Sequence, residues 1–212
     1  MHDEEQDEMR NAFRTSRRGF LKGVGVASAA TVILPSVGFA QDDKAGTPGL
    51  KEIGSGPLEI TLKVNGEARK VSIEPRTTLL DALREKLSLT GAKEICDRGS
   101  CGGCTVLVDG RSQAGCMTLA IDMQGKEIVT AEGIGKDPKF APLVDAFCEH
   151  DAAQCGFCIP GILVRSAAML MENPAPTSLQ IREGLAGNIC RCGTYSKIFD
   201  AVEACVKKGG VA

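Results

Sequence analysis

Tryptophan is absent from this chain, and tyrosine occurs once, at Tyr195. Histidine is scarce as well: His2 and His150 lie far apart, and neither has a companion histidine with which to hold a metal ion. The charges nearly cancel, since 25 lysines and arginines stand against 27 aspartates and glutamates. The two signs are mixed along the sequence, without the basic stripe that is typical of nucleic-acid binding. We therefore expect protein partners and no nucleic acid.

Cysteine is the residue in excess, with ten in 212 positions. The length suffices for one large domain or two small domains. After residue 40 the aromatic side chains are confined to the last third of the chain, and this uneven distribution favours two small domains. These side chains are Phe140, Phe147, Phe157, Tyr195 and Phe199.

Residues 1–40 have the pattern of a targeting segment. Arg17 and Arg18 stand in "SRRGFLK", and a Gly- and Ala-rich apolar run follows that ends in small residues at Ala40. Paired arginines in this setting resemble the bacterial twin-arginine export signal, which implies a periplasmic protein cleaved after Ala40. The alternative is a membrane anchor, but Pro35 and the many glycines argue against a stable span.

The next segments predict a linker over residues 41–57 and a first domain over residues 58–133. Residues 41–57 mix charges with Gly and Pro and have no apolar periodicity. Asn65 and Gly66 separate two alternating runs, which predicts a hairpin, and Thr77 or Thr78 is a plausible cap for a leucine-rich helix. The expected elements are strands at 58–64 and 67–73, a helix at 77–89 and strands at 104–110, 115–123 and 126–134. This pattern predicts a small α+β domain.

Four cysteines follow the expected helix in a C-x4-C-x2-C pattern with one more eleven residues on: Cys96, Cys101, Cys104 and Cys116. This is the spacing of plant-type [2Fe–2S] sites. Gly99, Gly102 and Gly103 allow the loop to curl tightly, so that backbone N–H groups approach the sulfurs. Zinc is the weaker alternative, because zinc sites usually pair two C-x2-C motifs. Disulfides are a second alternative, because the cysteines of an exported chain are even in number.

Residues 134–212 predict a second, helical domain. Apolar periodicity indicates four helices, which lie within 143–150, 154–173, 176–187 and 194–210. A C-x2-C pair and a C-x-C pair fall at the helix junctions: Cys155 and Cys158, then Cys190 and Cys192. Four thiolates suit a second [2Fe–2S] cluster, although these pairs alone suit zinc equally well. Cys148 and Cys205 lie in helical, partly apolar patterns, so we expect both to be buried structural thiols.

The combination of "CDRGSCGGCTVLVDG", "QCGFCIPG" and "GNICRCGTY" resembles the small iron–sulfur subunit of the molybdenum hydroxylases, the xanthine oxidase/aldehyde oxidoreductase family. The resemblance covers about residues 58 to 207, and the export signal makes the chain similar to the periplasmic aldehyde oxidoreductases. It implies a β-grasp ferredoxin-like domain followed by an all-α four-helix bundle. The family more commonly has "CRCTGY" where this chain has "CRCGTY", which keeps the ligands and changes only the local turn.

The resemblance also implies a role. A separate large subunit would hold a molybdenum–pterin cofactor, approached by Gln154 and Cys192, and electrons would leave through two [2Fe–2S] clusters on this chain. The acceptor would be a FAD-binding subunit or a cytochrome. The chain has no flavin or nucleotide fingerprint, so we expect it to conduct electrons and to carry no catalytic residue. The alternatives are the same role in an N-heterocycle hydroxylase with a cytochrome acceptor, and a free-standing exported ferredoxin.

Overall fold

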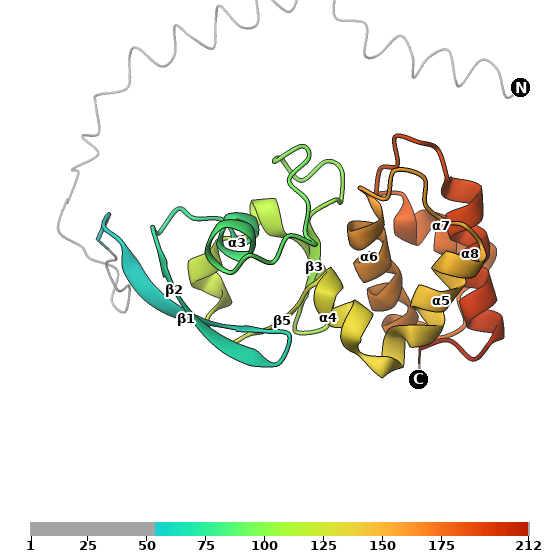
Figure 1. Ribbon diagram of the computed structural model, residues 1–212, viewed down its shortest axis with the longest axis horizontal. Coiled ribbons are helices and arrows are strands. Elements are labelled where there is room, and N and C mark those ends of the chain that lie inside the picture. Colours follow the sequence, from blue (N-terminus) through green and yellow to red (C-terminus); the bar gives the residue numbers. More distant parts are fainter. Residues whose placement is uncertain (1–53, 212) are drawn as a thin grey trace, which may run out of the picture. The chain divides into compact units, whose positions relative to one another are not determined.

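A mixed β-sheet precedes a group of helices along the chain (Figure 1). The computed structural model describes residues 54–211, so the predicted export signal and most of the predicted linker lie outside the described residues. The described residues belong to one compact unit, Glu52–Ala212. The expected α+β class, with a sheet domain followed by a helical domain, is confirmed.

The five-stranded sheet has the order β2-β1-β5-β3-β4. Its strands are β1 (Leu58–Val64), β2 (Glu67–Ile73), β3 (Thr105–Val108), β4 (Arg111–Ala114) and β5 (Glu127–Val129). The predicted hairpin is confirmed: β1 and β2 pair antiparallel, and Asn65 and Gly66 form the turn with φ of 53° and 81°. β5 pairs parallel with β1 and antiparallel with β3, so it ties the hairpin to the second antiparallel pair.

The helix predicted over 77–89 is shorter and less regular than expected. It consists of α3 (Leu79–Asp81) followed by a π-helical turn, η1 (Ala82–Lys86). Thr78 is its N-cap, because the hydroxyl oxygen of Thr78 accepts a hydrogen bond from the Asp81 backbone N–H at 3.1 Å. Leu79, Leu80 and Leu83 are buried against the sheet, as their spacing predicts.

One of the predicted strands is wrong, and another is shorter than expected. Residues 115–123 form two 3-10 turns, η2 (Gly115–Met117) and η3 (Ala120–Met123). Their backbone hydrogen-bonds to the start of the helix instead of to a strand, through Leu79 N–H to Thr118 O and Ala120 N–H to Thr77 O. The strand expected over 126–134 ends at Val129, and helix α4 (Ala131–Lys136) follows it.

The helical domain contains the four predicted helices and α4 in addition. After a short turn, η4 (Pro138–Phe140), these are α5 (Ala141–Glu149), α6 (Ile159–Glu172), α7 (Ser178–Leu185) and α8 (Tyr195–Lys207). Pro160 lies in the first turn of α6, and Thr177 and Gln180 form a capping box at α7. No helix in residues 54–211 combines the length and the apolar character that a membrane crossing needs.

The core of the helical domain extends into the sheet. Leu143, Ile162 and Ile198 are fully buried together, and Leu107 of β3 belongs to the same cluster. Cys205 is buried in it, as predicted. The prediction for Cys148 is wrong: it is exposed, because the buried stripe of α5 runs through Leu143, Ala146 and Phe147 and Cys148 lies outside it.

The two domains are in contact at glycine residues, where a larger residue would not fit. A Cβ atom placed on Gly161, at the start of α6, would collide with the carbonyl oxygen of Gly102 and crowd Gly103. Gly161 is itself buried. The backbone of α6 therefore packs directly on the loop that carries Cys101 and Cys104.

This contact predicts that Gly161→Ala destabilises the protein. The added methyl group must displace backbone atoms, and overpacking of this kind costs about 1–3 kcal/mol. Gly135→Ala in α4 is the control, because nothing lies within 4 Å of its Cβ position and alanine favours the helix. Chemical denaturation of both variants measures the difference. Equal free energies of unfolding for the two variants would show that the domains can move apart at Gly161 without a loss of stability.

Candidate metal centres

The first cysteine set lies in the loop between η1 and β3 and in the turn η2. Its members are Cys96, Cys101, Cys104 and Cys116, and all except Cys96 are buried. The sulfurs of Cys104 and Cys116 are 3.5 Å apart. The thiols of Cys96 and Cys101 lie within hydrogen-bonding reach of each other. The loop therefore arranges its four sulfurs as two pairs.

Backbone N–H groups point at these sulfurs. The Gly99 N–H donates to Cys116 Sγ at 3.3 Å, and the Gly103 N–H donates to Cys101 Sγ at 3.5 Å. Gly99 has a φ of 71°, a left-handed conformation that glycine adopts without strain. Such donors stabilise negative charge on sulfur. The glycines of the sequence motif thus have the role that was predicted for them.

The pKa values of the thiols in this loop are typical of a site that binds a positively charged group. Burial raises the pKa of the Cys104 thiol to about 11. The backbone of Arg98 hydrogen-bonds to Cys96 and, with the Cys101 thiol, lowers the pKa of Cys96 to about 7. Metal binding supplies the charge that turns buried thiols into thiolates.

The second cysteine set joins two helix junctions. Cys155 and Cys158 precede α6, and Cys190 and Cys192 lie between α7 and α8. Cys155 is within hydrogen-bonding reach of Cys192, and Cys158 is within reach of Cys190. These sulfurs also form two pairs, each with one member from either junction.

Local contacts hold Cys190 in place. Its sulfur lies 3.2 Å from the hydroxyl of Thr194, and its backbone N–H donates to the hydroxyl of Tyr195 at 2.8 Å. Burial acts to raise the pKa of Cys190, but the hydrogen bonds from Thr194 prevail and lower it to about 7. Burial raises the pKa of its neighbour Cys158 to about 12.

The paired sulfurs fit a cluster of two irons. No three Cys, His, Asp or Glu side chains converge on a single metal position in residues 54–211. A [2Fe–2S] cluster takes four thiolates distributed over its two irons, and each set offers two facing pairs with no disulfide among them. The donor type, the pairing and the N–H groups therefore suit this cofactor in both places.

The second set is open to the surface, whereas the first is mostly covered. Cys155 and Cys192 are exposed, as is Gln154. The Phe157 side chain, between the two cysteines of "CGFC", is 51% exposed. A partner can therefore reach this set directly.

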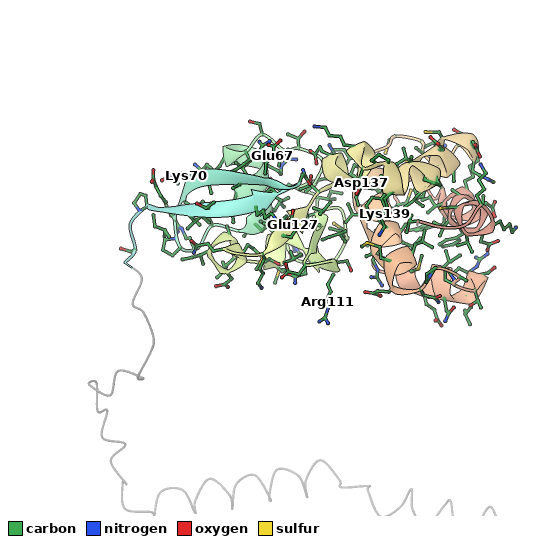
Figure 2. All side chains as sticks on the ribbon, turned by 90° about the horizontal axis from the view of Figure 1, so that it is seen from below. Glu67, Lys70, Arg111, Glu127, Asp137 and Lys139 are labelled. Carbon is green, nitrogen blue, oxygen red and sulfur yellow. The ribbon has the colours of Figure 1, made fainter. Side chains whose placement is uncertain are left out.

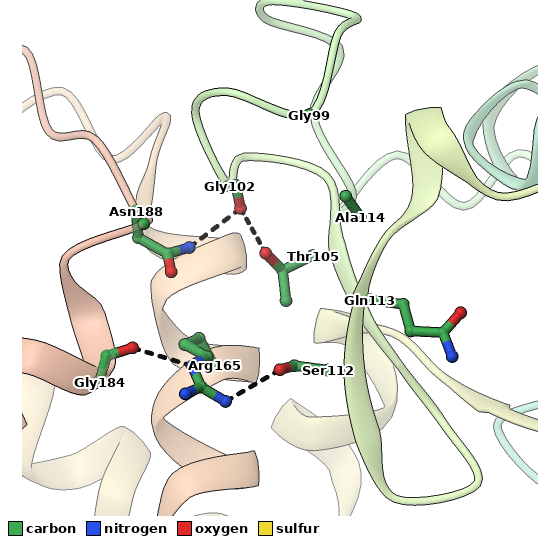
Figure 3. A pocket seen from close by; sticks show the side chains of 10 residues that line it. Gly99, Gly102, Thr105, Ser112, Gln113, Ala114, Arg165, Gly184 and Asn188 are labelled. Atoms are coloured by element: carbon green, nitrogen blue, oxygen red, sulfur yellow. Dashed lines mark hydrogen bonds between the residues drawn. The ribbon is translucent and has the colours of Figure 1, made fainter.

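Two hydrogen bonds connect the cysteine sets. The Ile189 backbone N–H donates to the carbonyl oxygen of Cys101 at 2.9 Å. The side-chain amide of Asn188 donates to the carbonyl oxygen of Gly102 at 3.0 Å (Figure 3). Sequence reasoning missed Asn188 and Ile189, since nothing in "GNICRC" indicates contacts with the distant residues Gly102 and Cys101.

Comparison with known proteins shows which cofactor this chain binds. Residues 62–129 match the family described as the 2Fe-2S iron-sulfur cluster binding domain, and residues 130–203 match the family described as the [2Fe-2S] binding domain. The aldehyde oxidoreductase iron-sulfur-binding subunit PaoA of Escherichia coli is 43% identical in an alignment of 203 positions that covers 89% of this chain and 86% of that protein. The chain belongs to the iron–sulfur small subunits of the molybdenum hydroxylases.

Other members of the family are similarly close. The nicotine 6-hydroxylase small subunit of Paenarthrobacter nicotinovorans is 44% identical over 145 residues, 68% of this chain and 87% of that protein. The structure of quinoline 2-oxidoreductase from Pseudomonas putida matches with a TM-score of 0.67 and 42% identity, over 73% of this chain and 99% of that chain. The aldehyde oxidoreductase of Desulfovibrio desulfuricans matches with a TM-score of 0.66 and 40% identity, over 71% of this chain and 17% of that longer chain.

Membership of this family confirms the main predictions about cofactors and role. The chain binds two [2Fe–2S] clusters, one in each domain, and the zinc and disulfide alternatives are wrong. It is the electron-transfer subunit of a molybdenum-containing oxidoreductase, and its partner is a large subunit with the molybdenum cofactor.

Proposed function

We propose that the first cysteine set holds one cluster and that the second set holds the other. The observation that carries this assignment is the pairing of sulfurs: Cys96 with Cys101, Cys104 with Cys116, Cys155 with Cys192 and Cys158 with Cys190. Each pair would bind one iron. When bound, each cluster supplies a centre that takes up and releases one electron.

The residues of this chain would keep the two centres close and in a fixed orientation. The Ile189 N–H···O=C Cys101 hydrogen bond joins the backbone of one set to the backbone of the other. It connects Cys101 itself with the residue next to Cys190, so few bonds separate the two sets. This contact supports a direct route between the domains.

On this proposal, electrons enter the chain at the second cysteine set. Gln154, Cys155 and Cys192 are exposed together. The Gln154 amide can both donate and accept hydrogen bonds, which suits the mixed edge of a pterin. A partner's molybdenum–pterin cofactor would therefore lie against Gln154 and Cys192.

Exposed apolar side chains support docking at both cysteine sets. Residues 54–211 contain six large hydrophobic side chains that are exposed, and four of these adjoin a cysteine of the two sets: Ile95, Met117, Phe157 and Ile189. A cluster of such residues marks an interaction surface. We assign Phe157 and Ile189 to the large subunit, and Met117 to the acceptor, a FAD-binding subunit or a cytochrome.

We infer that the substrate is an aldehyde, which the complex oxidises to a carboxylic acid in the periplasm. The match to the aldehyde oxidoreductase subunit covers 89% of the chain and so includes part of residues 1–53, whereas the nicotine 6-hydroxylase subunit matches 68%. An alignment that extends into this leader-like segment supports an aldehyde oxidoreductase as the nearer functional relative. The same role in an N-heterocycle hydroxylase is the second candidate, because quinoline 2-oxidoreductase matches the fold equally well.

Cysteine variants test the cluster assignment. Cys101→Ser should remove one EPR signal of the reduced protein and about half of its iron, and Cys158→Ser should remove the other signal. Cys148→Ser is the matched control, because Cys148 is exposed and lies outside both sets, and it should keep both signals. Loss of both signals in each ligand variant, in protein that remains folded by circular dichroism, would contradict two independent sites.

A second variant tests the entry side. Gln154→Ala should keep both EPR signals but weaken retention of the molybdenum cofactor in the purified complex. Loss of one hydrogen bond to the pterin costs about 1–3 kcal/mol when its partner is left unpaired. Gln124→Ala, at an exposed position of the sheet domain, is the control. Unchanged molybdenum content and unchanged cluster reduction by substrate would show that Gln154 makes no such contact.

Export is tested at Arg17 and Arg18. Changing both to lysine keeps the charge but removes the paired guanidinium groups. The complex should then remain in the cytoplasm, with any partner subunit that lacks its own signal. Fractionation and activity staining measure this, and Arg14→Lys is the control. Normal periplasmic activity of the double variant would exclude the twin-arginine route.

A further inference from the structure

A positively charged side chain lines a cavity that is also lined by residues near both cysteine sets. Arg165 of α6 lines a cavity of about 320 Å³, and two of its donors are occupied (Figure 3). Its Nε donates to the carbonyl oxygen of Gly184 at 2.9 Å, and its Nη1 donates to the hydroxyl oxygen of Ser112 at 2.9 Å. Arg165 therefore bridges the end of α7 and the edge strand β4.

Within the part of the chain that the structure describes, the charge of Arg165 is not paired with a carboxylate. None of the ion pairs formed within residues 54–211 includes Arg165. Its two hydrogen-bond acceptors, Gly184 O and Ser112 Oγ, are both neutral. The side chain is partly buried, and a partly desolvated charge without a counterion is unfavourable unless other negative charge lies near.

The clusters assigned above would supply negative charge near this cavity. Gly99 and Gly102 of the first cysteine loop line the same cavity, and so does Asn188, two residues before Cys190. Ser112 leads along β4 toward Cys116. A cluster on four thiolates is anionic, and reduction makes it more so. A cation nearby therefore favours the reduced form.

We propose that Arg165 raises the reduction potential of the clusters, and that the cluster of the first cysteine set is the more affected because two residues of its loop line the cavity. The guanidinium acts through its charge, and its two hydrogen bonds position it. This inference rests on the cluster assignment proposed above. A wrong assignment would change which cysteine variants lose a signal, whereas a wrong inference leaves both signals present with unchanged potentials.

A neighbouring arginine provides the matched control. Arg111 is adjacent to Ser112 on β4, but its side chain is exposed and projects away from the fold (Figure 2). Water and salt screen such a charge. Arg165 and Arg111 thus differ in burial and in contact with the cavity, while both carry the same charge.

The test is an EPR-monitored redox titration of the loaded protein. Arg165→Gln should lower the ratio of reduced to oxidised first cluster several-fold at a given potential. A tenfold change in this ratio corresponds to a shift of about 59 mV in the reduction potential of a one-electron couple. Arg165→Lys and Arg111→Gln should stay close to the wild type. Unchanged potentials in Arg165→Gln would overturn the proposal. So would an equal decrease in Arg165→Lys, because the effect would then come from geometry and not from charge.

A second pair of variants keeps the test valid if Arg165→Gln fails to fold. Ser112→Asp places a carboxylate where the hydroxyl accepts from Arg165, so it neutralises the charge and retains the bridge. Ser112→Asn is its neutral counterpart. The aspartate variant should lower the potential and the asparagine variant should not. Equal potentials in these two variants, each with full iron content, would overturn the proposal.

Discussion

The hydrogen bond from the Ile189 N–H to the Cys101 carbonyl oxygen joins the helical domain to the sheet domain at their two cysteine sets. A backbone-to-backbone bond of 2.9 Å requires that the two loops meet without side chains between them. Gly102 makes this approach possible, because a Cβ atom there would collide with the carbonyl oxygen of Gly187, and Gly161 lets α6 pack on the same loop. The separation of the clusters is thus set by backbone packing, and flexible side chains contribute little to it.

This constraint explains why the domains share a core. Leu107 of β3 packs with the helical residues, and α6 lies against β3. A loose hinge between the sheet domain and the helical domain would let the cysteine loops move apart, and close packing resists this because protein interiors have low compressibility. The asymmetry in exposure follows from the same arrangement: the first set is covered by its own domain, whereas Cys155 and Cys192 face outward.

The sequence predicts the cysteine chemistry better than it predicts the sheet. Ligand spacing is local, so the C-x4-C-x2-C and C-x2-C patterns indicate their sites without any knowledge of the fold. The Asn65–Gly66 turn and the amphipathic helices are local signals too. Residues 115–123 mislead because their apolar alternation serves two 3-10 turns that pack under α3. β4 is missed because "RSQA" lacks the β-branched residues of typical strands.

The contacts between domains have no local signal at all. From the sequence alone, Asn188 is a loop residue before a cysteine pair, and Arg165 is a charged residue in an otherwise apolar helix. Their partners, Gly102 and Ser112, are 86 and 53 positions away. Pairings of that separation follow only from the tertiary fold, so sequence reasoning could group the cysteines into two sets but not name the residues that connect one set to the other.

The exposed apolar residues beside the cysteines connect the fold to assembly. Phe157 and Ile189 are each about half-exposed in this chain, and burying them against a partner is favourable by the hydrophobic effect. On our proposal the same burial removes water from the open side of the second cluster. Solvent exposure is one of the factors that set cluster potentials. Docking of the large subunit would therefore both stabilise the complex and adjust the potential of the cluster that receives its electrons, which couples assembly to electron transfer.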